Sequence, residues 1–424
     1  MKRIVIASFA AVVIGCGAIT LAAPSNAVAP GNAATQSSHV AGQIMVKFRD
    51  KGAAAGALRQ HGLREGPGIG STGAQLIKVP AGKELQLIEA LSRNPVVEYA
   101  EPDEQVTAAT NDQYFPQQYA LQNTGQSLTS ANGTPVAADG TVDADVDAVE
   151  AWSLAKDIEI KVAVLDSGVD LDHPDINPKV VARANFSGAT SNEDKYGHGT
   201  HVAGIVAAAH NNKEGVAGVC PHCTILAGKV LNDSGVGSSS GLANGINWAV
   251  SNGAKVINMS IGVRASRTLE TAVNNAWNKG AVLVAAAGNG ANQTKIYPAA
   301  YPNVIAVGAT DNNDGKATFS TFGASWVDVA APGVAVYSTF PNHDFALRAP
   351  NKRALSYDIG NGTSMSSPIV AATAALVWSV NPGADPKSVR EKVELTSEKK
   401  SGQETYWAHG RVNACKALGG CPSP

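Results

Sequence analysis

Between residues 160 and 310 the chain repeats one pattern, an almost continuously apolar run followed by a stretch with helical spacing. The apolar runs are IKVAVLD (160–166), TILAGKVL (224–231), KVINMSI (255–261), AVLVAAAGN (281–289) and VIAVGAT (304–310). Strands read this way when both faces are buried, as in a parallel sheet covered by helices. Helix-like stretches such as 198–210, 238–251 and 268–279 lie between them. The pattern predicts an α/β fold, a doubly wound parallel sheet flanked by helices.

The first residues have the composition of a secretory signal peptide. Lys2 and Arg3 precede an apolar run from Ile4 to about Ala23, and Ser25-Asn26-Ala27 fits a cleavage site with small residues. No cationic stop-transfer flank follows, so we predict a signal peptide at 1–27 and a secreted protein without a stable membrane anchor. The alternative is a lipid anchor on Cys16, because VIGC loosely resembles a lipobox.

A smaller segment follows a Gly/Ala/Ser-rich spacer at 28–38. Residues 39–106 read as strand (44–48), helix (53–61), strand (74–79), helix (83–93) and strand (96–101), which predicts a small, ferredoxin-like α/β domain. Residues 107–110 (TAAT) are small and polar, which suits an exposed linker that can be cleaved. The large α/β domain then occupies 111–424.

The cysteines and the charge narrow the possible functions. Without the signal peptide four cysteines remain, and in an exported chain they suggest two disulfides with three possible pairings. The close pairs Cys220–Cys223 and Cys415–Cys421 are the simplest. A formal net charge of -2 argues against broad electrostatic binding of nucleic acid or anionic membranes. We expect a monomer.

Four polar side chains stand where such a fold collects its chemistry. Asp166 ends one apolar strand in VLDSGVD and Asn289 ends another in AAAGN, whereas His198 and Ser364 open helices in YGHGTHVAG and NGTSMSSP. Because the ends of parallel strands and the starts of the next helices share one edge, we expect all four to meet. Alone, each has a structural explanation: a helix cap, a turn or a packed histidine.

Together these residue types form a catalytic set. A serine hydroxyl becomes a good nucleophile when an imidazole accepts its proton, and the imidazole needs a buried carboxylate to hold its tautomer. The oxyanion that forms needs donors already in place, here the Asn289 amide and backbone N–H groups at the start of the Ser364 helix. The sequence therefore predicts acyl transfer through an acyl-enzyme, with Ser364 as nucleophile, His198 as base and Asp166 as the carboxylate that orients it.

The order Asp, His, Ser and the surrounding motifs resemble the subtilisin-like serine proteases. DSG at Asp166, GHGTHVAG at His198 and GTSMSSP at Ser364 match the three family signatures, and the likeness spans about residues 111–418. NDQYF (111–115) and TYWAHGRVNACKAL (405–418) are similar to the thermitase branch. The resemblance implies that Ser366, Ser367 and His201 pack structurally rather than react.

The resemblance also implies a substrate cleft for proteins and peptides. Ser260, Ile261 and Gly262 would pair with extended substrate and line the primary pocket, and Ala286, Ala287 and Gly288 would form another wall. These walls are small and apolar, so we expect broad specificity with large apolar or aromatic residues before the cut. The segment 341–359 is longer than its counterpart in thermitase-like relatives and either reshapes the cleft beyond the cut or is a solvated insertion.

Two calcium loops of the family can be carried over. AHNNKEGVAG (209–218) resembles the tight structural Ca²⁺ site, whose ligands would be Asp112, Asp175, the Asn212 side chain and the carbonyl oxygens of Ala209, Glu214 and Val216. The second loop departs from the pattern: Asn185 stands where an acid is expected, and Glu193 and Asp194 are the nearby acids. The second site is therefore in doubt.

Residues 39–106 resemble the inhibitory and chaperone propeptide of these proteases, especially IMVKF and VVEYAEPDEQV. A parallel sheet is a slow, non-local folding problem that a pre-folded partner can template. The chain would then be a zymogen, inhibited by its own propeptide and processed by itself within 106–110.

Two other readings compete with a protease. Cys220-Pro221-His222-Cys223 is a redox-type CxxC, which would suit a thiol-disulfide oxidoreductase. Its position before a strand, in a chain with a protease constellation, favours a structural disulfide. An inactive binding protein on the same fold is disfavoured because every member of the triad is present.

Overall fold

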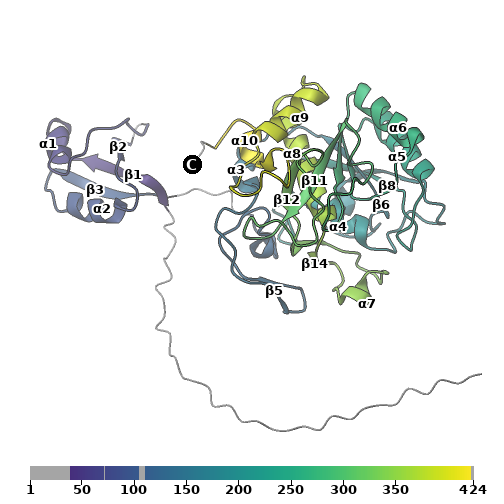
Figure 1. Ribbon diagram of the computed structural model, residues 1–424. Helices are drawn as coiled ribbons and strands as arrows, with labels where there is room; N and C mark the ends of the chain where they lie inside the picture. Colours follow the sequence, from purple (N-terminus) through teal and green to yellow (C-terminus); the bar gives the residue numbers. More distant parts are fainter. Residues whose placement is uncertain (1–38, 71, 105–109, 422–424) are drawn as a thin grey trace, which may run out of the picture. The chain divides into compact units, whose positions relative to one another are not determined.

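The computed structural model describes residues 39–70, 72–104 and 110–421. The predicted signal peptide (1–27), Cys16, the spacer (28–38) and most of the linker (107–110) lie outside the described residues. The chain divides into two compact units between Val106 and Thr107, which are treated separately below (Figure 1).

The N-terminal unit has the predicted β-α-β-α-β order. Its elements are β1 (His39–Phe48), the 3₁₀ helix η1 (Lys51–Ala53), α1 (Ala54–Arg59), β2 (Ala74–Lys78), α2 (Glu84–Ser92) and β3 (Val97–Glu104). The sheet order is β2-β1-β3, and β1 is antiparallel to both neighbours. Its core comes from alternate residues of β1 (Ile44, Val46 and Phe48) packed with residues of both helices, so the unit has a hydrophobic core of its own.

The C-terminal unit is built on an eight-stranded sheet with the order β15-β12-β11-β10-β9-β6-β8-β7. Every neighbouring pair in this sheet is parallel. The strands are β6 (Lys161–Asp166), β7 (Val180–Asn185), β8 (Thr224–Lys229), β9 (Val256–Met259), β10 (Val282–Ala286), β11 (Val304–Thr310), β12 (Val329–Pro332) and β15 (Gly410–Arg411). The predicted doubly wound parallel sheet is confirmed.

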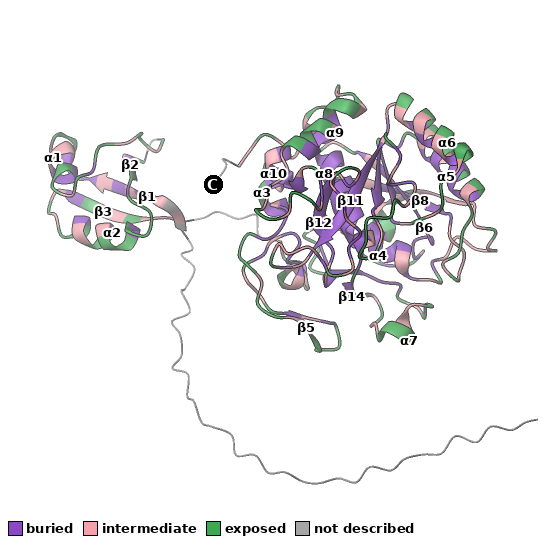
Figure 2. Ribbon diagram, viewed as in Figure 1, coloured by how far each residue is buried: buried purple, intermediate pink, exposed green. Residues whose placement is uncertain are grey.

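Helices cover both faces, which explains the continuous apolar runs. The principal helices are α4 (His198–Ala207), α5 (Ser239–Ser251), α6 (Arg267–Asn278), α8 (Thr363–Val380) and α9 (Pro386–Leu395). In β6, Val162 and Val164 join the core that contains α4 and α8, whereas Ala163 and Leu165 join the core under α5 and α6. Figure 2 shows buried strands between helices whose outer surfaces are exposed.

Shorter elements complete this unit. They are η2 (Phe115–Gln117), β4 (Leu128–Thr129), β5 (Pro135–Ala137), α3 (Ala148–Trp152), η3 (Asn177–Lys179), β13 (Val336–Thr339), α7 (Arg348–Asn351), β14 (Tyr357–Gly360) and α10 (Ala414–Ala417). The pairs β4–β5 and β13–β14 are antiparallel. The segment 341–359 thus contains α7 and most of β14.

Helix α8 is the central helix of the unit. Among the described helices it alone has the length and apolar composition of a membrane span, but 89% of that stretch is buried inside the protein. It packs against β9, β10, β11 and β12 on one side of the sheet. The alanine-rich sequence lets it lie close to the strands, and this packing fixes the position of Ser364 near its start.

Candidate active site

The edge of the sheet at the strand ends brings together the predicted catalytic residues. Asp166 is the last residue of β6, His198 is the first residue of α4, and Ser364 is the second residue of α8. Gly197 and Gly362 precede the two helices with φ of 100° and 142°, conformations that L side chains rarely adopt. Glycine at these positions therefore allows the tight turns that place His198 and Ser364 at the helix starts.

Asp166 and His198 form a direct, buried pair. His198 Nδ1 lies 2.8 Å from Asp166 Oδ1, and this carboxylate is 1% exposed. The backbone N–H of Ser167 also donates to Asp166 Oδ1 at 2.7 Å. Burial disfavours protonated His198, but the charge and hydrogen bond of Asp166 outweigh burial, so the pKa of His198 lies above its ordinary value. A proton on Nδ1 leaves Nε2 as the basic nitrogen.

Ser364 and His198 line the same cavity, which has a volume of about 300 Å³ and also includes Asn289. The Ser364 hydroxyl donates to the carbonyl oxygen of Ser260 at 3.2 Å. In return, Ser260 Oγ donates to the carbonyl oxygen of Ser364 at 2.8 Å. Catalytic hydrogen bonds are often long or misaligned before substrate binds, so this placement is compatible with proton transfer to His198.

Asn289 is oriented by the start of α8. Its Oδ1 accepts hydrogen bonds from the Thr363 backbone N–H (2.9 Å) and from Thr363 Oγ1 (3.0 Å). The amide nitrogen is left as the donor group, and a Cβ added at Gly362 would lie only 3.1 Å from it. The amide therefore has the orientation an oxyanion donor needs, and Gly362 leaves the necessary room.

The other serines and the second histidine of the motifs are packed inside the protein. Ser367 Oγ donates to Asn258 Oδ1 at 2.7 Å, and both residues are buried, as is Ser366. The ring of His201 lies 4.6 Å from that of Phe340. Burial lowers the pKa of His201 to about 3, so this imidazole is neutral. These environments agree with the structural roles expected for them.

Asp194 has an organising role that the sequence did not reveal. Its carboxylate accepts from Ser167 Oγ (2.8 Å), from the N–H of Gly197 (2.8 Å), and from the N–H and hydroxyl of Thr200 (2.8 and 2.7 Å). Burial raises its pKa, against the lowering effect of these hydrogen bonds. Asp194 thereby ties the segment after Asp166 to the start of α4. Its only sequence signal was an acid four residues before His198.

The two predicted substrate walls lie at the ends of β9 and β10 and meet at a residue that the sequence analysis missed. A Cβ added at Gly262 or Gly288 would lie 2.7 or 2.5 Å from the side chain of Ile296. Val263 and Tyr297 exchange backbone hydrogen bonds of 2.6 and 3.1 Å, which hold Ile296 in this place. Ile296 is therefore placed to limit the depth of a pocket between the walls.

The loop after α4 brings together the predicted calcium ligands. Asp112 accepts from the Asn212 N–H at 3.0 Å, and Asp175 accepts from Asn212 Nδ2 at 2.8 Å and the Val216 N–H at 2.9 Å. Within the described chain, no hydrogen bond reaches the carbonyl oxygens of Ala209, Glu214 or Val216.

The electrostatics of this loop favour a cation. Burial, with the nearby charges of Asp112 and Glu214, raises the pKa of Asp175 to about 7 against the lowering effect of its hydrogen bonds. Carboxylates held close together beside unused carbonyl oxygens match the hard oxygen donors that Ca²⁺ prefers. Asn212 presents its nitrogen rather than its oxygen to Asp175 here, so its amide would have to turn to ligate a metal.

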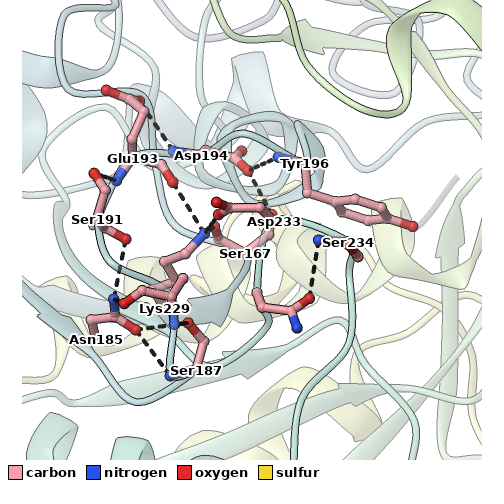
Figure 3. Close-up of polar contacts among 12 residues, drawn as sticks. Ser167, Asn185, Ser187, Ser191, Glu193, Asp194, Tyr196, Lys229, Asp233 and Ser234 are labelled. Atoms are coloured by element: carbon pink, nitrogen blue, oxygen red, sulfur yellow. Dashed lines mark hydrogen bonds and ion pairs between the residues drawn. The ribbon is translucent and has the colours of Figure 1, made fainter.

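The loop before α4 is cross-linked by side chains instead (Figure 3). Asn185 Nδ2 donates to the carbonyl oxygens of Ala189 (2.8 Å) and Ser191 (3.1 Å). The ammonium of Lys229, which is 1% exposed, donates to the carbonyl oxygens of Ser167 (2.5 Å) and Glu193 (3.1 Å). It also pairs with Asp233 at 3.0 Å. A cation in this loop would have to compete with Asn185 and with the ammonium of Lys229 for these carbonyl oxygens, which supports the doubt about the second site.

Both predicted disulfides are present, Cys220–Cys223 and Cys415–Cys421. Cys220 and Cys223 are 2% and 0% exposed and belong to the core that contains α4 and α8. A redox-active CxxC needs an accessible thiol, so this burial favours a structural disulfide over an oxidoreductase site.

Comparisons with known proteins agree with this geometry. A sequence model of the subtilase family matches residues 157–410, and one of the fervidolysin N-terminal prodomain matches residues 25–103. Thermitase of Thermoactinomyces vulgaris is 47% identical over 275 residues, which are 64% of this chain and 93% of the relative. A thermophilic serine proteinase of Bacillus sp. (strain AK1) is 39% identical over 389 residues, 90% of this chain and 88% of the relative.

A solved structure of a protease from Pseudoalteromonas arctica has a similar fold. It superposes with a TM-score of 0.63 at 28% sequence identity, and the match covers 74% of this chain and 99% of the other. This likeness agrees with the α/β architecture of the C-terminal unit.

Proposed function

Because the chain belongs to the subtilase family and is a serine endopeptidase of the thermitase branch with an N-terminal prodomain, we propose that Ser364, His198 and Asp166 are its catalytic triad. The observation that carries the proposal is the 2.8 Å contact between His198 Nδ1 and buried Asp166. It leaves Nε2 as the base in a cavity that also contains Ser364.

The proposed reaction has two steps. Ser364 Oγ attacks the carbonyl carbon of the scissile bond while its proton passes to His198 Nε2, and this proton then passes to the departing amine. The acyl-enzyme ester is hydrolysed when water gives a proton to His198 and attacks the same carbon; the bond from this carbon to Ser364 Oγ then breaks, and His198 returns the proton to Ser364 Oγ. Asp166 stabilises the imidazolium in both steps. Asn289 Nδ2 and the Ser364 N–H, for which no acceptor is found in the described chain, would bind the oxyanion.

The test is labelling with a fluorophosphonate together with peptide hydrolysis. The parent enzyme should be labelled at Ser364, whereas Ser364→Ala should lose labelling and on the order of 10⁶-fold in kcat, the loss known for such triads. Ser251→Ala, at the exposed end of α5, is the matched control and should keep both. Hydrolysis by Ser364→Ala at the parent rate would refute the assignment.

For the residue before the cut we propose an apolar side chain, large or aromatic, held between Ser260–Gly262 and Ala286–Gly288. The support is the apolar lining, with Ala286 and Ala287 buried and Ile296 between the walls. Ile296→Ala should deepen the pocket and raise kcat/KM for Phe relative to Leu by about 3- to 10-fold, since a methylene in such a pocket contributes about 1 kcal/mol or more. An unchanged ratio would show that Ile296 does not bound the pocket.

We further propose that residues 39–106 are the propeptide, which inhibits the catalytic domain (111–424) until the chain cuts itself within 106–110. The separate hydrophobic core of residues 39–104 supports an independently folding prodomain. Purified Ser364→Ala should remain uncut, and its complete maturation without another protease would contradict self-processing. Removal of a signal peptide at 1–27 and secretion complete this proposal, which the cations Lys2 and Arg3 and the apolar run after them support.

For the loop after α4 we propose a structural Ca²⁺ held by Asp112, Asp175, the Asn212 amide oxygen and the carbonyl oxygens of Ala209, Glu214 and Val216. The unused carbonyl oxygens and the raised pKa of Asp175 support this assignment. Bound there, Ca²⁺ would neutralise the two carboxylates and hold the loop against the chain near residue 112. It would take no part in the reaction at Ser364.

A further inference from the structure

The long segment 341–359 packs against the residues that lead into the triad histidine. Phe345 stacks on Phe340, with ring centroids 5.1 Å apart and planes 8° from parallel. A Cβ added at Gly197 would lie 2.3 Å from the Phe345 ring, so the ring covers the turn before His198. This part of the segment is therefore a packed wall rather than a solvated insertion.

Hydrogen bonds hold the same wall in place. The N–H groups of Ala346 and Leu347 donate to the carbonyl oxygens of Lys195 (2.9 Å) and Tyr196 (3.2 Å). On the far side of α7, the Arg353 N–H donates to the carbonyl oxygen of Arg348 at 2.9 Å. The position of Arg353 is thus set by the end of a helix that is itself fixed beside the active site.

Arg353 lines the catalytic cavity. Leu347 and Asn351 line it as well, together with Ser364, His198 and Asn289. In the described chain the Arg353 guanidinium has no carboxylate partner, whereas Arg348, on the same segment, pairs with Asp344 at 3.1 Å. The nearby carboxylate of Asp358 is taken up by backbone N–H groups. The cavity therefore contains a half-buried cation that the protein itself does not neutralise.

The position of the cavity identifies which part of a substrate meets this cation. The walls proposed for the acyl side, Ser260–Gly262 and Ala286–Gly288, do not line it. Asn361 and Met365, which flank the nucleophile segment, do. The cavity thus lies across Ser364 from the acyl walls, where the departing amine and the residues attached to it must be.

We propose that Arg353 is a specificity-determining residue that binds a carboxylate on the leaving-group side, so that the enzyme prefers peptides with Asp or Glu in the first two positions after the cut. The proposal rests on the function proposed above, because it assumes that Ser364 attacks in this cavity. It assigns a substrate class to a segment that the sequence alone left without a role.

The experiment compares internally quenched peptides that share one acyl side, with Leu before the cut, and carry Asp, Asn or Lys at the first and second positions after it. Mass spectrometry confirms the cut bond. The parent should show a kcat/KM about 5- to 10-fold higher for the Asp peptide than for the Lys peptide. The half-buried guanidinium of Arg353 attracts the carboxylate of the first and repels the ammonium of the second. Raising the salt concentration should reduce this ratio, and this measurement needs no variant.

Variants then assign the preference to one side chain. Arg353→Gln should bring the Asp-to-Lys ratio to within about twofold, and Arg353→Glu should reverse it. Arg348→Gln, the matched control, should keep the parent ratio. Arg348→Gln should cleave the Asn peptide at the parent rate, and both Arg353 variants should still react with a fluorophosphonate at Ser364, which shows that they are folded and active.

Each outcome decides the proposal. A parent without preference for Asp over Lys, or a preference that persists in Arg353→Gln, overturns the role of Arg353 while leaving the triad intact. Failure of the parent to cleave the Asn peptide or to react with a fluorophosphonate overturns the proposed function, and this subsite with it.

Discussion

Two loops flank the helix that carries His198, and they are stabilised in different ways. The loop before α4 has its carbonyl oxygens bound by Asn185 and by the buried ammonium of Lys229. The loop after α4 has two buried carboxylates, Asp112 and Asp175, and three carbonyl oxygens to which no described group donates a hydrogen bond. The first loop is held by the side-chain ammonium of Lys229, the last residue of β8, whereas the second has the oxygen atoms to take a cation from solution.

The difference has a thermodynamic consequence. A lysine ammonium is always present, so the first loop should be insensitive to solution ions. A bound metal adds stability that grows with its free concentration, about 2.7 kcal/mol when that concentration is 100 times Kd. The stability of the loop before α4 should therefore depend on the Lys229 side chain, and that of the loop after α4 on the free Ca²⁺ concentration. The following measurements separate the two. All of them use chemical unfolding of full-length Ser364→Ala protein, so that self-digestion does not interfere.

The largest effect is expected from Lys229→Met. The variant leaves two buried carbonyl oxygens and Asp233 without their cation, and breaking such a buried network costs about 3–5 kcal/mol of unfolding free energy. In the active enzyme kcat should fall as well, because the carbonyl of Ser167 lies directly after Asp166. Lys195→Met, at an exposed position in the loop before α4, is the control and should stay within about 0.5 kcal/mol. A Lys229→Met protein as stable as its parent would show that the ammonium of Lys229 does not stabilise the loop before α4.

Removing calcium should have the next largest effect. A chelator should lower the unfolding free energy by about 2–3 kcal/mol at millimolar starting Ca²⁺, and Asp175→Asn should abolish this dependence. Asp172→Asn changes an exposed acid three residues away and should keep it. Equal stability of the parent with and without chelator would show that the loop after α4 is not stabilised by a bound metal ion.

Asn185→Asp should make the stability of the loop before α4 depend on Ca²⁺, as is expected for the loop after α4. The carboxylate cannot donate to Ala189 and Ser191, so in chelator the variant should lose about 1–2 kcal/mol. Added Ca²⁺ should restore part of this loss beyond its effect on the parent, because the new carboxylate would supply an acidic oxygen ligand beside the released carbonyl oxygens. Asn185→Ala should show the loss without the extra restoration. If both variants respond alike, the loop has no latent metal site.

The smallest effect concerns pH and the ion pair between His343 and Glu193, which are 3.2 Å apart. Burial opposes protonation, but the carbonyl of Asp344 and the Glu193 carboxylate raise the pKa of His343. A raised folded-state pKa adds stability that is full below about pH 6.5 and is lost as pH rises through the folded pKa. This half-buried pair should contribute less than about 1 kcal/mol, and His343→Gln should flatten this decline. An unchanged pH profile of the unfolding free energy in the variant would show that the His343–Glu193 pair does not contribute to it.

The sequence by itself determined the fold and the placement of the candidate catalytic residues. Continuous apolar runs can be buried only between two layers of helices, and β6 meets this demand by sending Val162 to one core and Ala163 to the other. The order of the motifs placed Asp166, His198 and Ser364 at one edge of the sheet because parallel strands all end there. These are local patterns, which a chain displays before it folds.

Tertiary structure alone decided what surrounds those groups. Asp194 and Lys229 look like ordinary charged residues in the sequence, and their importance comes from burial among partners up to 62 residues away. In the sequence Ile296 is one apolar residue among many, and only the folded chain packs its side chain against Gly262 and Gly288. Arg348 and Arg353 are alike in the sequence, but in the described chain Arg348 pairs with Asp344 whereas Arg353 has no carboxylate partner and lines the catalytic cavity. Such effects depend on which distant groups are excluded from water together, and no local pattern in the chain encodes that.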